Sequence, residues 1–264
     1  MCNKLKEVLD QDQTFNRKGF IPYIMGGDGG LQKMIEQIHC LEKLGATAIE
    51  VGVPFSDPVA DGPVIQKAGL RAMEVGITLH SILAALSEER NSITIPLIIM
   101  TYANPVIRMG VDEFAEKCSQ AGIVGCIIPD VPFEEERDFK YALKKRNIIL
   151  IRLVPLTASL SRIKKLCHEA EGFIYAVTVN GTTGEKDRIP STYLEERIHL
   201  VKEYTAIPVY AGFGISNVDT ANELLKFSDG VIVGSKIVSS FHNENYNQIK
   251  DFAKGLERTT QLIN

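Results

Sequence analysis

The chain lacks tryptophan altogether, and it has no apolar run long enough to cross a membrane. Its longest apolar stretches, such as 95–100 and 230–233, have the length of a β-strand, whereas a helix that spans a bilayer needs about 20 apolar residues. The N-terminal segment MCNKLKEVLD has no apolar core of the kind that a signal peptide requires. These absences predict a cytoplasmic protein without a membrane segment.

Cysteine clusters are absent as well. The five cysteines are an odd number and include no CxxC pair, which argues against both a disulfide framework and a zinc motif. The five histidines are scattered, so no group of His and Cys has the spacing of metal ligands. We therefore expect free thiols, as in a reducing cytosol, and no metal site.

An excess of positive charge is the third absence. The chain has 29 Lys and Arg residues against 33 Asp and Glu residues, a formal net charge of −4 and a pI near 5.8. Surfaces that bind nucleic acid are usually basic, so the composition argues against a nucleic-acid partner. The hydrophobic fraction of 45% and the charged fraction of 23% are those of an ordinary globular domain.

Short apolar runs alternate along the chain with segments of helical periodicity. The runs have strand length and recur eight times, at 20–25, 48–52, 96–101, 124–128, 148–153, 173–178, 208–211 and 230–233. Amphipathic helices are expected between them, at 31–44, 65–74, 79–89, 111–121, 134–145, 159–170, 192–204 and 218–225. Asp112, Ser159 and Ser216 are candidate helix caps.

Eight strands that alternate with helices in 264 residues favour parallel β/α units closed into a barrel. We predict an α/β fold: a single-domain (β/α)8 TIM barrel over residues 1–264, with an extra helix at the N-terminus and another at 246–262. An open, doubly wound sheet is the alternative. However, the glycine-rich segment 26–30 after the first strand lacks the GxGxxG spacing of a dinucleotide site.

Two carboxylates stand out near the second expected strand. Glu50 lies among apolar residues within the strand, and Asp61 follows in a loop that contains three prolines. Burying a carboxyl group raises its pKa, which suits a general acid or base near neutral pH. Two carboxyls in different surroundings indicate separate roles. The alternative is a buried Glu that forms a structural ion pair with an Arg or Lys.

Glycine-bearing turns follow the last three expected strands, at 181–184, 212–214 and 234–235. Active sites of such barrels lie at the carboxyl ends of the strands, and phosphate often binds after strands seven and eight. Glycines let backbone N–H groups approach an anion, and Ser235 would open a short helix whose N-terminus favours negative charge. Each turn alone is equally consistent with a tight turn, but the three together favour a phosphate site.

Apolar residues near the strand ends form a candidate wall for a flat aromatic ligand. For Ile127 and Leu153, a place in the barrel core explains the pattern equally well. The candidates are Tyr23, Met100, Tyr102, Ile127, Leu153, Tyr175 and Phe213.

Residues 50–63, EVGVPFSDPVADGP, closely resemble the signature of tryptophan synthase alpha subunits. The match is ungapped, and it continues in the family's order through shorter segments from residue 20 to residue 235, so it covers almost the whole chain. These segments are FIPY at 20–23, MTYANP at 100–105, PDVP at 129–132, TG at 183–184, GFGIS at 212–216 and GS at 234–235.

The resemblance implies a retro-aldol cleavage of indole-3-glycerol phosphate to indole and glyceraldehyde 3-phosphate. Glu50 matches the family's proton-shuttling Glu, and Asp61 matches the Asp that stabilises the positive indolenine tautomer. Thr183 matches the threonine of a loop that closes over the substrate. The family's phosphate site maps onto Gly184, Gly214, Gly234 and Ser235, and its ring-binding wall onto Tyr23, Met100, Ile127, Tyr175 and Phe213.

The resemblance also implies a partner. Family members work as αββα complexes in which the beta subunit carries pyridoxal phosphate (PLP), so no cofactor is expected in this chain. The loops at 54–63 and at Asn104-Pro105 are candidate contacts with the beta subunit. The alternatives are a free-standing lyase, a non-catalytic activator of the beta subunit, or another phosphate-binding barrel enzyme. The last could be an indole-glycerol-phosphate synthase or a sugar-phosphate isomerase. Both would lack the PFSDP run, and the synthase typically needs a catalytic lysine, whereas no lysine here lies on an apolar strand.

Three positions depart from the family's usual pattern. Gly29 stands where proline is common, Met25 where threonine is common, and Val179 where some members have arginine. Because these positions flank the substrate loops, we expect them to affect loop closure more than the chemistry.

Overall fold

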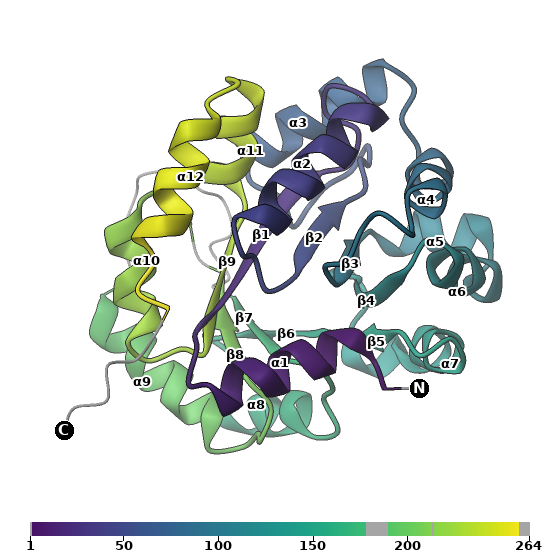
Figure 1. Ribbon diagram of the computed structural model, residues 1–264. Coiled ribbons are helices and arrows are strands. Elements are labelled where there is room, and N and C mark those ends of the chain that lie inside the picture. Colours follow the sequence, from purple (N-terminus) through teal and green to yellow (C-terminus); the bar gives the residue numbers. More distant parts are fainter. Residues whose placement is uncertain (1, 178–189, 213, 259–264) are drawn as a thin grey trace.

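The computed structural model describes residues 2–177, 190–212 and 214–258. Its parallel strands form one sheet in the order β5-β4-β3-β2-β1-β9-β8-β7-β6, with helices around the outside (Figure 1). The strands are β1 Gly19–Met25, β2 Ile49–Gly52, β3 Leu97–Met100, β4 Ile123–Ile127, β5 Ile149–Leu150, β6 Arg152–Pro155, β7 Ile174–Val177, β8 Val209–Ala211 and β9 Gly230–Val233.

The two end strands of this order, β5 and β6, are consecutive in the chain and separated only by Ile151. The Ile151 N–H donates to the carbonyl of Cys126 on β4 at 2.9 Å. β5 pairs with β4 and β6 pairs with β7, so the single strand predicted at 148–153 closes the barrel. The predicted (β/α)8 architecture is confirmed, with its fifth strand divided in two.

Helices cover the outer face of the sheet, and most begin within a few residues of the predicted positions. They are α1 Lys4–Thr14, α2 Leu31–Lys43, α3 Pro63–Glu74, α4 Leu79–Glu88, α5 Ala103–Met109, α6 Val111–Gln120, η1 Phe133–Glu135, α7 Arg137–Lys145, α8 Leu160–Cys167, α9 Ser191–Lys202, α10 Val218–Leu225, α11 Ser235–His242 and α12 Tyr246–Gly255.

Several predicted details of the helices are wrong. Asn104 and Pro105 lie in helix α5 and not in a loop. Helix α12 ends at Gly255, short of the predicted residue 262. Of the three predicted helix caps, Ser159 is confirmed: it caps α8 through a bond from the Arg162 N–H at 3.3 Å. Asp112 and Ser216 do not cap a helix, because Gly110 and Asn217 occupy the cap positions of α6 and α10.

Helix α1 lies across one end of the barrel, where its Leu5 and Leu9 join the buried side chains of the barrel interior (Figure 1). Leu5, Leu9 and Ile98 of β3 are all at most 2% exposed in this interior cluster. The interior is therefore packed from this end, and the opposite end, at the carboxyl ends of the strands, is left for a ligand.

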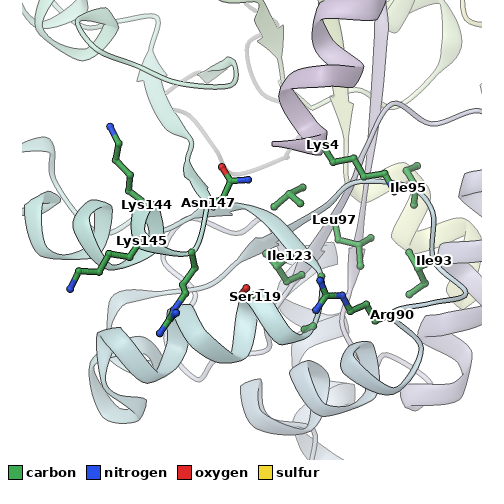
Figure 2. A pocket seen from close by; sticks show the side chains of 14 residues that line it. Lys4, Arg90, Ile93, Ile95, Leu97, Ser119, Ile123, Lys144, Lys145 and Asn147 are labelled. Carbon is green, nitrogen blue, oxygen red and sulfur yellow. The ribbon is translucent and has the colours of Figure 1, made fainter. Parts of the chain in front are cut away.

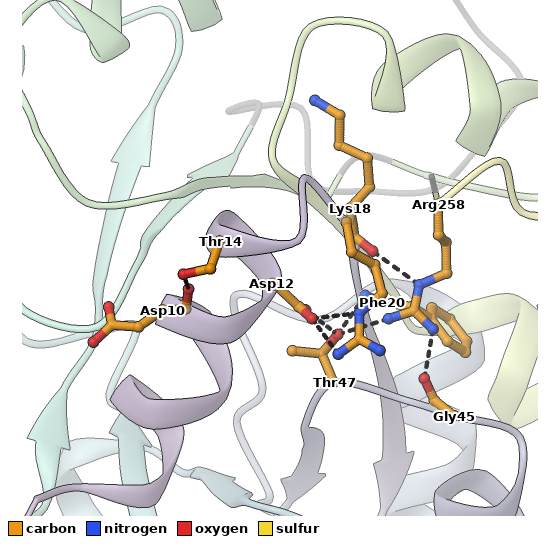
Figure 3. Close-up of polar contacts among 9 residues, drawn as sticks. Asp10, Asp12, Thr14, Lys18, Phe20, Gly45, Thr47 and Arg258 are labelled. Carbon is orange, nitrogen blue, oxygen red and sulfur yellow. Dashed lines mark hydrogen bonds and ion pairs between the residues drawn. The ribbon is translucent and has the colours of Figure 1, made fainter. Parts of the chain in front are cut away.

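A polar network near the same end joins the two ends of the chain (Figure 3). The Thr47 hydroxyl donates to Asp12 of α1 at 3.0 Å and accepts from the Phe20 N–H at 3.1 Å and from Arg258 at 2.9 Å. Arg258 also donates to the carbonyl of Lys18 at 2.8 Å. Asp12 is 3% exposed and also accepts a bond from Arg17 at 2.5 Å, so Thr47 and Arg17 together satisfy a carboxylate that would be costly to bury alone.

Among the described residues, no single helix combines the length and hydropathy needed to cross a membrane.

Candidate active site

Glu50 lies in the middle of β2 and is 1% exposed. Neither carboxyl oxygen has a hydrogen-bond partner among the described residues, so the alternative of a structural ion pair with Arg or Lys finds no support there. Burial, and secondarily the charge of Asp61, raise the pKa of Glu50 to about 8. A buried carboxyl with no partner is held in its neutral form at pH 7, ready to donate a proton.

Asp61 lies in the loop between β2 and α3 and has a different environment. It accepts a hydrogen bond from the Tyr102 hydroxyl at 3.1 Å, and the same hydroxyl accepts from the Ala60 N–H at 3.1 Å. Burial raises the pKa of Asp61 to about 6, and the bond from Tyr102 works in the opposite direction. The carboxyl group of Asp61 is therefore mostly ionised at pH 7, unlike that of Glu50.

Tyr102 is the functional residue whose role the sequence did not reveal. It follows β3 directly, is 2% exposed, and stacks on Phe55 with ring centroids 5.1 Å apart. The sequence placed Tyr102 among the apolar wall candidates, but nothing in its spacing indicated a bond to Asp61, which is 41 positions away. Its position directly after a strand was the one available signal.

A cavity of about 130 Å³ at the carboxyl ends of the strands brings eight of the predicted site residues together. Other residues line it that the sequence analysis did not single out, including Ala60, Ile65, Ile215 and Ile232. The predicted residues that line it are Tyr23, Glu50, Asp61, Met100, Tyr175, Gly214, Gly234 and Ser235.

Six of the predicted residues are not placed on the wall of this cavity. Tyr102 bonds Asp61, and Leu153 packs against the side chains of the barrel interior. Ile127 is fully buried with the side chains of the barrel interior, so its contact with a ligand stays a prediction. Thr183, Gly184 and Phe213 lie outside the described residues.

Tyr23 reaches from β1 over the neighbouring strand. It is paired with Glu50 in the register of β1 and β2, and its phenol oxygen would lie 1.8 Å from a Cβ added to Gly52. The ring therefore fits only because residue 52 has no side chain. Gly52 is thus needed to admit the phenol beside the two carboxyl groups.

The phosphate end of the cavity is formed by Gly214 and by the start of helix α11. Gly234 is the residue before α11, and Ser235 is its first residue. Free backbone N–H groups and the helix dipole attract anions at such a position. The carboxyl pair and this helix end line one cavity, which suits a ligand with a phosphate at one end.

Two of the departures from the family's pattern lie at the end of β1 and in the turn that follows it. Gly29 has φ of +86°, whereas proline is fixed near −65°, so a proline would not fit this turn. The turn is tied to α3 by a two-pronged bond from Arg71 to Asp28, at 2.8 and 2.6 Å. Met25 is buried against α3 residues such as Ala68 and Ala72. Val179 lies outside the described residues.

A second, wider hollow of about 740 Å³ lies at the amino ends of the strands (Figure 2). Most of its cations have a structural explanation, since they lie near the C-terminal ends of helices, where they complement the helix dipole; Lys4, at the start of α1, does not. Arg90 donates to the carbonyl of Gln120, the last residue of α6, at 3.3 Å. Lys144 and Lys145 end α7 and point away from the apolar floor in Figure 2. This hollow holds no carboxyl group for catalysis.

No group of three or more His, Cys, Asp or Glu residues suited to a metal ion is found in the described ranges. All five cysteines are free thiols, and Cys118, Cys126 and Cys167 are buried. Burial raises the pKa of each of these three thiols, so they act as small apolar side chains.

Comparison with known proteins decides the family. Residues 9–263 match the family model described as tryptophan synthase alpha chain. This chain belongs to that family. The tryptophan synthase alpha chain of a Bacillus cereus strain is 48% identical over 246 residues, which are 92% of this chain and 93% of the relative. That of Bacillus mycoides is 47% identical over 249 residues, 93% of this chain and 95% of the relative.

Solved structures agree. The tryptophan synthase subunit alpha of Legionella pneumophila superposes with a TM-score of 0.88 at 29% identity, over 97% of this chain and 99% of the other. A Mycobacterium tuberculosis tryptophan synthase chain gives a TM-score of 0.88 at 30% identity, with the same coverage. The comparisons support an alpha subunit of tryptophan synthase, an enzyme of tryptophan biosynthesis, over a free-standing lyase or a non-catalytic activator.

Proposed function

We propose that this tryptophan synthase alpha chain cleaves indole-3-glycerol phosphate to indole and glyceraldehyde 3-phosphate. One observation carries the proposal: two carboxyl groups with pKa values of about 8 and about 6 line one cavity. At pH 7 one is a proton donor and the other a carboxylate, which is the pair that this cleavage requires.

The protonated Glu50 donates its proton to the ring carbon that carries the glycerol side chain. The ring becomes a positively charged indolenine, and Asp61 accepts a hydrogen bond from the ring N–H and stabilises that charge. The Glu50 carboxylate then removes the proton from the adjacent side-chain hydroxyl. As the C=O bond of the aldehyde forms, the C–C bond breaks and its electron pair restores the neutral indole ring. Glu50 ends protonated, as it began.

The ends of the substrate would be held by different parts of the cavity. The phosphate would lie at Gly214, Gly234 and Ser235, where α11 begins, and the ring between Tyr23, Met100 and Tyr175. Gly184 would add to the phosphate site, while Phe213 and Ile127 would extend the ring wall. Closure of the loop that carries Thr183 would exclude water and strengthen the charge interactions.

The partner in this proposal is a tryptophan synthase beta subunit in an αββα complex, which would carry the PLP and receive the indole. Two exposed apolar side chains near the cavity suit such a contact: Val59 is 84% exposed in the loop after β2, and Ile107 of α5 is 59% exposed. The loop that carries Val59 is joined to the start of α5 by the bond from the Ala60 N–H to Tyr102. No step of the cleavage uses the partner's cofactor. We expect the chain to act in the cytoplasm, as a subunit of a biosynthetic enzyme.

Indole release from indole-3-glycerol phosphate by the purified chain tests this proposal, with and without a tryptophan synthase beta subunit. We expect slow release by the chain alone and a large increase with the partner. Fast release that the partner does not change would indicate a free-standing lyase. A chain that raises the beta subunit's activity but releases no indole would contradict the proposed reaction.

The bond from Tyr102 to Asp61 predicts a change in pH dependence. Tyr102→Phe removes a donor to the Asp61 carboxylate, so the pKa of Asp61 rises from about 6 and the residue is protonated at higher pH. Because the reaction needs ionised Asp61, the acidic limb of kcat/KM against pH should move to higher pH. Tyr141→Phe, at a phenol that is 64% exposed, is the control. An unchanged acidic limb in Tyr102→Phe would contradict this role.

A further inference from the structure

The Tyr23 phenol is a polar group of the cavity to which the cleavage, as written above, assigns no chemistry. The residue is 6% exposed and lines the cavity, yet its hydroxyl makes no hydrogen bond to any other described residue. Its oxygen is not among the fully buried side-chain atoms that lack a partner in the described residues, so it faces the cavity and not the packed interior. The hydroxyl is therefore available for a partner that arises during the reaction.

Geometry places that hydroxyl beside the two carboxyl groups. Tyr23 and Glu50 are direct neighbours in the pairing of β1 with β2, where strands lie about 4.8 Å apart. The phenol oxygen lies over Gly52, which faces the same side of β2 as Glu50 because strand side chains alternate. The phenol therefore lies between Glu50 in β2 and the loop after β2, which carries Asp61.

Glu50 lacks what its reaction requires. In the resting state its neutral carboxyl tolerates burial without a partner, but once the proton moves to the ring a carboxylate remains in the same apolar place. A buried carboxylate needs a hydrogen-bond donor. The titratable groups that interact with Glu50 are Asp61, Tyr23 and Tyr175. Tyr175 faces Glu50 from β7, across the barrel interior, whereas Tyr23 stands directly beside it on the neighbouring strand β1.

We propose that Tyr23 is a positioning residue for the cleavage: its hydroxyl donates a hydrogen bond to the Glu50 carboxylate that forms when the substrate ring is protonated. The bond stabilises the charged intermediate and holds the carboxylate where it next removes the side-chain proton. This inference rests on the proposed function of Glu50. In this proposal Tyr23 assists the proton transfers of Glu50 from the neighbouring strand. It also explains why residue 52 is glycine, since a side chain there would displace the Tyr23 ring.

The test is Tyr23→Phe, which keeps the ring and removes only the hydroxyl. A hydrogen bond to a charged group contributes enough that kcat should fall about tenfold or more, while KM stays unchanged because the ring still binds substrate. Loss of a donor to the ionised form also raises the pKa of Glu50, so the alkaline limb of kcat/KM should move to higher pH. Tyr210→Phe is the control, since Tyr210 is a buried phenol in the barrel interior.

A second measurement does not depend on turnover. The C=O stretch of the protonated Glu50 carboxyl can be titrated by infrared difference spectroscopy, with Glu50→Gln to identify the band. Tyr23→Phe should raise the midpoint of that titration by about one pH unit, and Tyr210→Phe should leave it in place. An unchanged midpoint together with an unchanged kcat would overturn the inference, and so would a rise in KM with both pH limbs fixed. Absence of indole release in the unmodified protein would instead count against the proposed function.

Discussion

Glu50→Gln should reduce the rate of indole release by about 10² to 10⁴-fold, the usual contribution of a positioned general acid or base. The amide has nearly the shape of the protonated carboxyl group, but it neither donates a proton to the ring nor accepts one from the hydroxyl. Because Glu50 has no hydrogen-bond partner among the described residues, the substitution breaks no bond that holds the fold. The loss should therefore appear in kcat and kcat/KM, with KM little changed.

Activation of the beta subunit is a second measurement, which separates a loss of chemistry from a loss of assembly. If the chain activates a beta subunit, Glu50→Gln should still do so, since Glu50 is buried inside the barrel and cannot itself touch a partner. Glu74→Gln, at the end of helix α3, controls for the change of charge. Indole release by Glu50→Gln close to that of the unmodified chain would contradict the role of Glu50 as the proton shuttle.

Glu50→Gln, which should lower activity, should raise the stability of the fold at alkaline pH. The pKa of Glu50 is about 8 in the folded chain against an ordinary 4.5, so the folded state holds a proton that the unfolded state releases between these values. This contribution to stability is fully present below pH 4.5 and is lost as the pH rises through 8. Glu50→Gln carries no such proton, and above pH 8 it should unfold with a free energy a few kcal/mol higher than the unmodified chain.

Urea denaturation at several pH values tests this expectation. The difference between the two proteins should be small at acidic pH and should grow through the titration of Glu50. Asp61 titrates in both proteins and cancels in the difference. A constant difference across the pH range would mean that Glu50 does not titrate in the expected window.

The sequence predicted the barrel well because the strand pattern is local and repeats. Each of the eight apolar runs overlaps an observed strand, and the fifth contains β5 and part of β6. Helix α5 was missed because Pro105 indicated a loop. Pro105 is the third residue of the helix, in the first turn, where backbone N–H groups have no partner within the helix and proline is tolerated.

The candidate site was predictable in its residues and not in its contacts. The positions of Glu50 and Asp61 followed from a carboxylate in an apolar strand and a turn-rich loop. The bond that distinguishes them joins Asp61 to Tyr102 across two different loops, and no spacing rule relates those positions. The phenol of Tyr23 over Gly52 likewise depends on the register of two strands, which only the folded sheet fixes.

The buried ion pair of Arg152 and Glu136 is another contact that the sequence did not predict. Breaking it should have the largest effect on the stability of the fold. Arg152 enters from β6 and Glu136 precedes α7, with side chains 7% and 11% exposed. Two nitrogens of Arg152 bond both carboxylate oxygens. A third nitrogen bonds the carbonyls of Leu166 and His168 at the end of α8. One side chain therefore ties β6, α7 and α8 together.

Arg152→Met should lower the free energy of unfolding by about 3–5 kcal/mol, because it leaves a buried carboxylate without its partner. Adding Glu136→Leu to Arg152→Met should recover part of the loss, since the uncompensated charge is then removed as well. Urea denaturation of the two single variants and the double variant gives the coupling energy.

The chain offers a matched control in the neighbouring pair of Arg162 and Glu134. This pair also joins a guanidinium to both oxygens of a carboxylate, but its side chains are 36% and 46% exposed. Water solvates both groups when the bond is broken, so Arg162→Met should shift the urea midpoint far less than Arg152→Met. Equal shifts at the two sites would show that burial is not what makes the inner pair matter. If adding Glu136→Leu lowers stability below that of Arg152→Met alone, the cost of Arg152→Met does not come from the stranded carboxylate.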